Sequence, residues 1–169
     1  MDATALRELQ APIKARYRED PATAAVHNVA EGRFEGDDVT CTVPGWAGDA
    51  VAGLHPSTGG DGSKACSADM LLEALTACAG VTLRSVATAM SIPLDSATVR
   101  AEGSWDARGT LGLSKETPVG LSGITITFEL ATEAPEDKVA KLVELTERYC
   151  VIYQTIKGGT PINTRLVRV

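Results

Sequence analysis

The sequence is poor in several residue types that usually mark a binding or metal site. Aromatic residues make up only 4% of its 169 residues, and its four cysteines contain no C-x-x-C pair. His27 and His55 lie far along the chain from any cysteine, so a zinc site of ordinary spacing is not expected. The formal net charge is −6, and basic residues do not gather into clusters. This balance argues against nucleic acid or an anionic membrane as a partner.

Long apolar segments are also missing from the sequence. No uninterrupted apolar run reaches the roughly 18 residues that would indicate a membrane span. The opening stretch MDATALRELQ carries Asp2 and Glu8 and has no apolar core of the kind that a secretory signal needs. We therefore expect a cytoplasmic protein. In a reducing compartment the cysteines are resting thiols, either buried fillers or redox-active groups.

The hydrophobic share, 44%, suffices for a core without disulfides or metals. We expect a single domain over residues 1–169, with residues 1–21 as an N-terminal helical arm. Consecutive strands and few helices predict an α+β fold with an antiparallel sheet. The expected elements are helices at 3–18, 67–90 and 134–150, strands at 24–30, 38–43, 97–105, 123–130 and 162–169, and a glycine-rich loop at 44–66.

Two cysteines fall on the two long helices. On a helical wheel Cys78 lies opposite the polar stripe that begins at Asp69, and apolar residues cover most of the remaining surface. That pattern predicts a helix buried nearly all round. Cys150 faces inward in the last turn of the second helix. A disulfide needs Cα atoms about 4.4–6.8 Å apart, so the pair can be bridged only at a close helix crossing.

The patterning leaves the role of these thiols open. A buried cysteine usually acts as a small hydrophobe, and apolar surroundings raise its pKa and make it inert. A reactive Cys78 would need a nearby cation to hold its thiolate. Cys66 is a rival, because it directly precedes the expected helix, where backbone N–H groups lower a thiol pKa. Cys41 is assigned to the core, on the apolar face of its strand.

Four segments carry a family resemblance. SADMLLEALTACAGVTLRSVA resembles the central helix of the OsmC/Ohr family of thiol peroxidases, and SIPLDSATVRAEGSWD resembles the segment that follows it. APEDKVAKLVELTERYCVIYQTI is similar to the family's second helix, which ends in a second cysteine. PINTRLV is similar to its closing strand. The resemblance spans roughly residues 24–169.

The resemblance implies an OsmC-like fold with two long central helices and an intertwined homodimer. It implies a peroxidase for organic hydroperoxides that needs no metal, haem or flavin cofactor. Cys78 would be the thiolate that attacks the peroxide and becomes a sulfenic acid, and Cys150 would resolve it as a disulfide. A dithiol such as a lipoylated protein would restore both thiols.

The resemblance also implies an acid and an arginine that support the thiolate, and here the sequence departs from the family. Ala68 stands where the family has a glutamate, with Asp69 beside it. Arg33 best matches the position of the arginine. These departures keep an alternative open, in which the fold serves small-molecule binding without catalysis, or redox sensing through Cys66.

Overall fold

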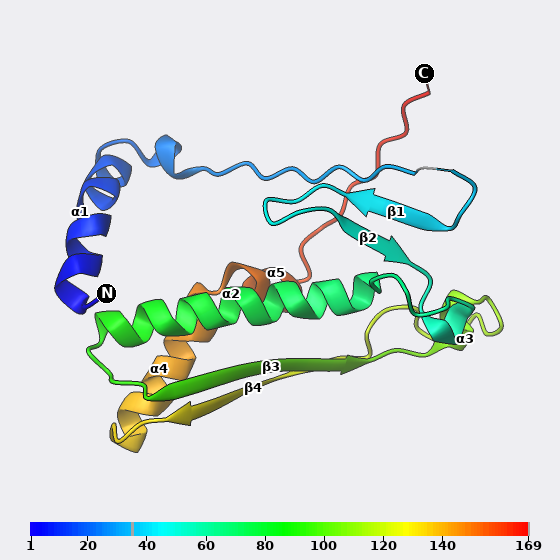
Figure 1. Cartoon of the computed structure of the whole chain (residues 1–169). Helices are drawn as coiled ribbons and strands as arrows, with labels where there is room; N and C mark the ends of the chain where they lie inside the picture. The colour runs from blue at the N-terminus through cyan, green and yellow to red at the C-terminus, as the bar shows by residue number, and fades with distance from the viewer. Residues whose placement is uncertain (35, 169) are drawn as a thin grey trace.

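The computed structural model describes residues 1–34 and 36–168 and confirms a mixed α+β fold (Figure 1). Its two sheets are both small antiparallel hairpins, β1–β2 and β3–β4. The helices and strands are α1 (Ala3–Glu19), β1 (Thr40–Val43), β2 (Ala50–Gly53), α2 (Ser67–Ala89), β3 (Ser96–Ser104), α3 (Ala107–Thr110), β4 (Gly123–Ala131), α4 (Glu136–Tyr149) and α5 (Val151–Lys157), with short 3-10 turns at Pro21–Ala24 and Pro56–Thr58.

The centre of the molecule is a packed body formed by α2, β3, β4, α4 and α5. In Figure 1, α2 runs along the β3–β4 hairpin, and α4 and α5 pack against α2. The hairpin pairs Ser96 with Ala131 at one end and Ser104 with Gly123 at the other. Because side chains alternate along a strand, one face of the hairpin turns Val99, Ile126 and Phe128 toward the helices. The predicted strands at 97–105 and 123–130 are thus confirmed.

The core of this body follows one stripe of α2. Its residues recur every four positions, as a single helix face requires: Leu75, Ala79, Leu83 and Ala87. Ile92, Leu142 of α4 and Cys150 complete the two buried clusters. The prediction that α2 is buried nearly all round is wrong for this chain, because Val81 is 74% exposed and Leu71 is 43% exposed. The hairpin, α4 and α5 cover only one side of the helix.

The helix α2 also begins and ends for identifiable reasons. Asp69 lies in its first turn, where a negative charge interacts favourably with the positive end of the helix dipole. After Ala89 the chain turns through Ser91, whose φ is 55°, and then meets Pro93. Within the described part of the chain, α2 is the one helix long and apolar enough to cross a membrane, a weak indication because core helices pass the same test.

The remaining segments lie outside the packed body (Figure 1). The N-terminal helix α1 contacts α2, while residues 25–32 run extended and exposed. The predicted strands at 24–30 and 162–168 do not form within this chain, and Val169 lies outside the described residues. The predicted loop 44–66 contains β2, which pairs with β1 from Thr40↔Gly53 to Val43↔Ala50.

Candidate active site: two thiols between α2 and α5

Cys78 lies in the middle of α2 and is half-buried. It packs against the buried cluster of Leu75, Ala79 and Cys150. The predicted inward orientation of Cys78 is therefore confirmed. Its hydroxyl neighbour, Thr82, donates to the Cys78 carbonyl oxygen at 2.8 Å, which fixes the backbone of the following turn.

Cys150 is fully buried, with 0% exposure. It is not in the last turn of a single helix, as the pattern predicted, but in an extended residue (φ −74°, ψ 111°) between α4 and α5. There it caps α5, and its Sγ accepts the backbone N–H of Tyr153 at 3.4 Å. No glycine or proline marks this break, so the sequence gives no local signal for a second helix. The break turns the first amides of α5 toward α2.

The two thiols belong to the same cluster, and their pKa values are shifted in opposite directions. Partial burial alone would raise the pKa of Cys78. Hydrogen bonds from the Ile152 N–H, the Cys150 thiol, the Val151 N–H and the Thr82 hydroxyl outweigh burial and lower the pKa below its ordinary value. Burial raises the pKa of Cys150, and Cys78 raises it further, against the effect of the Tyr153 amide. At the same pH, these directions favour the thiolate form more at Cys78 than at Cys150.

The source of this activation differs from the one expected from the sequence. No cation is among the groups that contribute most to the pKa of Cys78. The backbone amides of Val151 and Ile152 take that place, and sequence reasoning missed them because α5 itself was not foreseen. A side-chain pattern carries no direct information about where backbone amides point.

Arg33 and Asp69 lie apart from these thiol contacts within the chain. The Arg33 side chain is 66% exposed and pairs with Glu31 at 3.0 Å, while its backbone bridges to Thr42 beside β1. Asp69 is exposed in the first turn of α2, nine residues before Cys78, a rise of about 13 Å along the helix. Their roles in activating Cys78 stay predictions.

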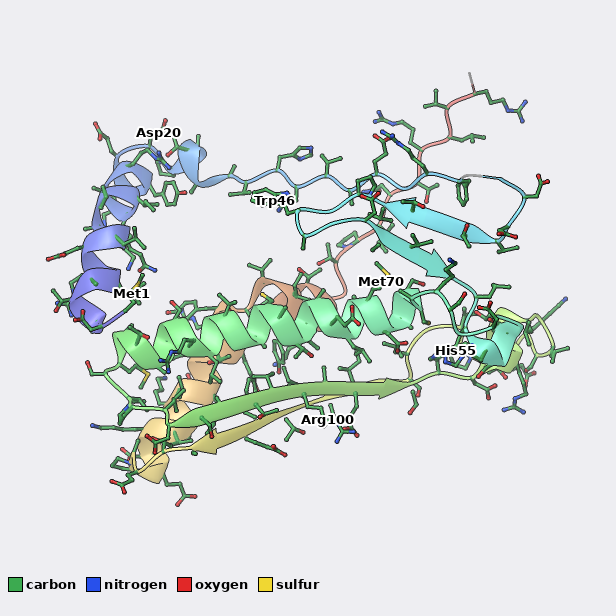
Figure 2. The ribbon with its side chains drawn as sticks, in the orientation of Figure 1. Met1, Asp20, Trp46, His55, Met70 and Arg100 are labelled. Atoms are coloured by element: carbon green, nitrogen blue, oxygen red, sulfur yellow. The ribbon has the colours of Figure 1, made fainter. Side chains whose placement is uncertain are left out.

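The other two cysteines lie elsewhere. Cys41 is only half-buried in the β1–β2 hairpin, beside Gly32, rather than in the core. Cys66 is the N-cap of α2 and makes no side-chain capping bond. It lines a cavity of about 390 Å³ together with His55 and Trp105, whose rings meet edge to face at 5.4 Å. Figure 2 places His55 beside the far end of the β3–β4 hairpin and Arg100 on its outer side.

A second cavity of about 380 Å³ lies next to the thiol cluster. Leu75 of α2, Ile124 and Ile126 of β4, and Tyr153 and Lys157 of α5 form its wall. The Lys157 ammonium lies 5.3 Å from the Tyr153 ring centroid, at the end of α5. Among residues 1–34 and 36–168, no group of His, Cys, Asp and Glu side chains is arranged to hold a metal ion.

Comparison with known proteins gives a consistent match. The sequence model of the family described as OsmC-like protein matches residues 60–165, more than half of the chain. No curated protein matches the sequence.

Solved structures match the fold at low sequence identity. An OsmC-like protein from Mycoplasma pneumoniae is 18% identical, with a TM-score of 0.63, and the match covers 79% of this chain and 90% of that chain. An organic hydroperoxide resistance protein from Legionella pneumophila is 18% identical, with a TM-score of 0.60 over 79% and 93% of the two chains. The hydroperoxide resistance protein OhrB of Bacillus subtilis is 17% identical, with a TM-score of 0.52 over 78% and 92%. At such identity these structures establish the shared fold alone.

Proposed function

The chain belongs to the OsmC-like protein family, and from this and its paired thiols we propose that it reduces organic hydroperoxides through Cys78 and Cys150. The Cys78 thiolate attacks the peroxide oxygen, so that an S–O bond forms, the O–O bond breaks, and the departing alkoxide takes a proton to leave as the alcohol. Cys150 then attacks the sulfenic acid, which forms the disulfide and releases water. A dithiol, such as a lipoylated protein, reduces the disulfide and is itself oxidised.

One observation carries this proposal: two thiols lie in the same cluster and have opposite pKa shifts. Attack on a peroxide requires a thiolate, and the lowered pKa of Cys78 favours that form. Resolution requires a second thiol within reach that is not itself the first target of oxidation. Cys150 fits both conditions, since it lies in the same cluster as Cys78, is fully buried and has a raised pKa.

The partner and location follow from the same proposal. Only 28% of the most apolar 18-residue stretch of α2 is buried, and its exposed residues include Val81 and Leu71. A second copy of the chain that covers this face would form the homodimer implied by the family resemblance. A cycle that returns both cysteines to thiols also suits the reducing cytoplasm, which we propose as its location.

Peptide mapping after oxidation tests the proposed reaction. Reduced protein treated with one equivalent of cumene hydroperoxide is expected to form a Cys78–Cys150 disulfide, identified by mass spectrometry, and to consume peroxide when a dithiol is supplied. Cys78→Ser should abolish consumption, and Cys150→Ser should stop the cycle at the sulfenic acid. Cys41→Ser is the matched control and should retain full turnover. Unchanged peroxide together with no Cys78–Cys150 bond would refute the proposal.

The second cavity supports a different candidate function, in which the fold binds a small molecule without catalysis. Its apolar wall and the Lys157 ammonium at its rim suit a small apolar acid. Ala68, where the family has a glutamate, also favours this candidate, and Cys66 could then act as a redox-sensing thiol. A thermal-shift screen with medium-chain carboxylates distinguishes the two: stabilisation without any peroxide consumption favours binding.

A further inference from the structure

We propose that Gln154 positions the resolving thiol: its side-chain amide fastens the break between α4 and α5, which places Cys150 in the cluster with Cys78. This inference rests on the proposed peroxidase reaction and adds a positioning residue to it. Gln154 acts through the backbone that carries Cys150 rather than on a reacting sulfur, so its effect can be measured without peroxide.

The break at Cys150 separates a carbonyl group of α4 from its ordinary helical partner. In a continuous helix the Glu147 carbonyl oxygen would accept the N–H of Val151, four residues further along the chain. Cys150 is extended, with ψ at 111°, and this backbone angle turns the Val151 N–H away from that carbonyl. The end of α4 therefore carries a backbone acceptor that a side chain or water has to satisfy.

Gln154 supplies the missing donor from the other side of the break. Its side-chain Nε2 donates to the Glu147 carbonyl oxygen at 2.8 Å, seven residues back along the chain. Its backbone N–H donates to the Cys150 carbonyl oxygen at 3.0 Å. One residue thus joins α5 both to the end of α4 and to the extended residue between them. Because the two bonds reach different points, together they restrict the angle at which α5 leaves α4.

That angle determines where the Cys150 sulfur lies. The Cys150 N–H donates to the Thr146 carbonyl oxygen of α4 at 3.0 Å, and the Cys150 Sγ accepts the Tyr153 N–H of α5 at 3.4 Å. The residue is therefore held from both helices, and a change in their relative angle moves its sulfur with respect to Cys78 on α2. Two groups react faster when their relative position is restricted in this way, so the Gln154 bond should favour formation of the disulfide.

The neighbouring residue Thr155 offers a matched comparison. Its hydroxyl also donates to a backbone carbonyl oxygen at 2.8 Å, but the acceptor is Val151, so both partners lie within α5. Both side-chain bonds are exposed and equally short, yet only the Gln154 bond spans the break. Removing each in turn separates the positioning of Cys150 from the general stability of α5.

Equilibrium with a glutathione redox buffer tests the inference. Oxidation of the two thiols to the Cys78–Cys150 disulfide reduces one glutathione disulfide to two glutathione thiols, and the equilibrium constant is the effective concentration of one cysteine at the other. Gln154→Met removes the donor but keeps the side-chain length, and should lower this value by about three- to fivefold, as for one neutral hydrogen bond. Gln154→Lys keeps a donor that can reach a carbonyl at a helix C-terminus and should restore most of it. Thr155→Val should leave it unchanged.

Peptide mapping assigns the disulfide in each sample, and circular dichroism checks that each variant is folded. Equal effective concentrations in wild type and Gln154→Met would overturn the inference, and so would a Gln154→Lys value as low as that of Gln154→Met. An equal decrease in Thr155→Val would also overturn it, because the bond would then serve only the stability of α5. A wild-type chain that forms no Cys78–Cys150 disulfide at any buffer ratio would overturn it too. If the expected shifts appear but peroxide is not consumed, only the peroxidase reaction is refuted, so the two failures can be told apart.

Discussion

The packed body and the outlying segments contain similar apolar residues, but only the body buries them. In the body, α2 shares its buried stripe with the β3–β4 hairpin, α4 and α5, and both thiols lie inside that contact. In the outlying part, Val26, Val29, Phe34 and Leu166 are as apolar as core residues but are exposed. The difference is that the body contains its own packing partners, whereas the outlying segments do not find theirs within one chain.

The largest expected effect on the free energy of unfolding comes from truncating a leucine in the packed body, with a leucine in the outlying part as the comparison. Leu142 is 0% exposed between α4 and α2, and Leu166 is 80% exposed in the C-terminal segment. Leu142→Ala should lower the free energy of unfolding by about 2–5 kcal/mol, since it leaves a cavity. Leu166→Ala should change it by less than about 0.5 kcal/mol in the single chain. Urea unfolding measures both, and similar losses would show that the C-terminal segment is packed in solution.

The next largest effect concerns the outward face of α2. Val81 is exposed on the side that we propose a second copy covers. Val81→Asp would place an unpaired charge in that interface and should convert dimer to monomer, as measured by analytical ultracentrifugation. Thr98→Asp, on the exposed side of β3, is the control and should leave the assembly unchanged. A wild-type chain that is already monomeric would remove the basis for the proposed dimer.

The same contrast explains how much could be predicted from the sequence. In the body, the alternation in GITITFEL reflects contacts that the chain itself makes, and the predicted strand at 123–130 and helix at 67–90 both form, as β4 and α2. Residues 24–30 and 162–168 also carry apolar side chains, such as Val26 and Leu166, but a strand also needs a neighbouring strand edge to satisfy its backbone. An apolar sequence pattern indicates only that a segment favours burial. Whether a strand forms depends on a neighbouring strand with which it can pair.

The candidate site was predicted in part for a related reason. Helical spacing predicted that Cys78 and Cys150 point inward, and both lie in the same cluster, although Cys150 is an extended residue between two helices. The donors that lower the pKa of Cys78 include the amides of Val151 and Ile152, which depend on one extended residue between α4 and α5. Strand β2 was missed because its sequence, AVAG, has a single strong strand former, and the strand depends on its pairing with β1.

A smaller effect tests the loop that joins the β1–β2 hairpin to the body. A Cβ at Gly60 would overlap the backbone carbonyl of Leu54, whereas a Cβ at Gly120 would meet open space. Gly60→Ala should therefore cost about 1–3 kcal/mol of unfolding free energy and Gly120→Ala almost nothing. Thermal unfolding of the two variants provides the comparison. Equal stability of the two would mean that this loop rearranges freely and does not hold the hairpin to α2.

The smallest effect is expected at the surface of the body, where Asp106 begins α3. Its carboxylate accepts the Arg108 N–H at 2.9 Å and pairs with the guanidinium at 2.6 Å, which lowers its pKa from 3.8 to about 2. Because the folded pKa is lowered, the stabilisation is present above pH 3.8 and is lost as the pH falls toward 2. Asp106→Asn should thus lower the Tm slightly at pH 5 and leave it equal to wild type near pH 2. The ion pair is fully exposed, so salt should weaken the difference further. A carboxyl titration by NMR with a midpoint at the ordinary value would show that Arg108 does not hold this pair in solution.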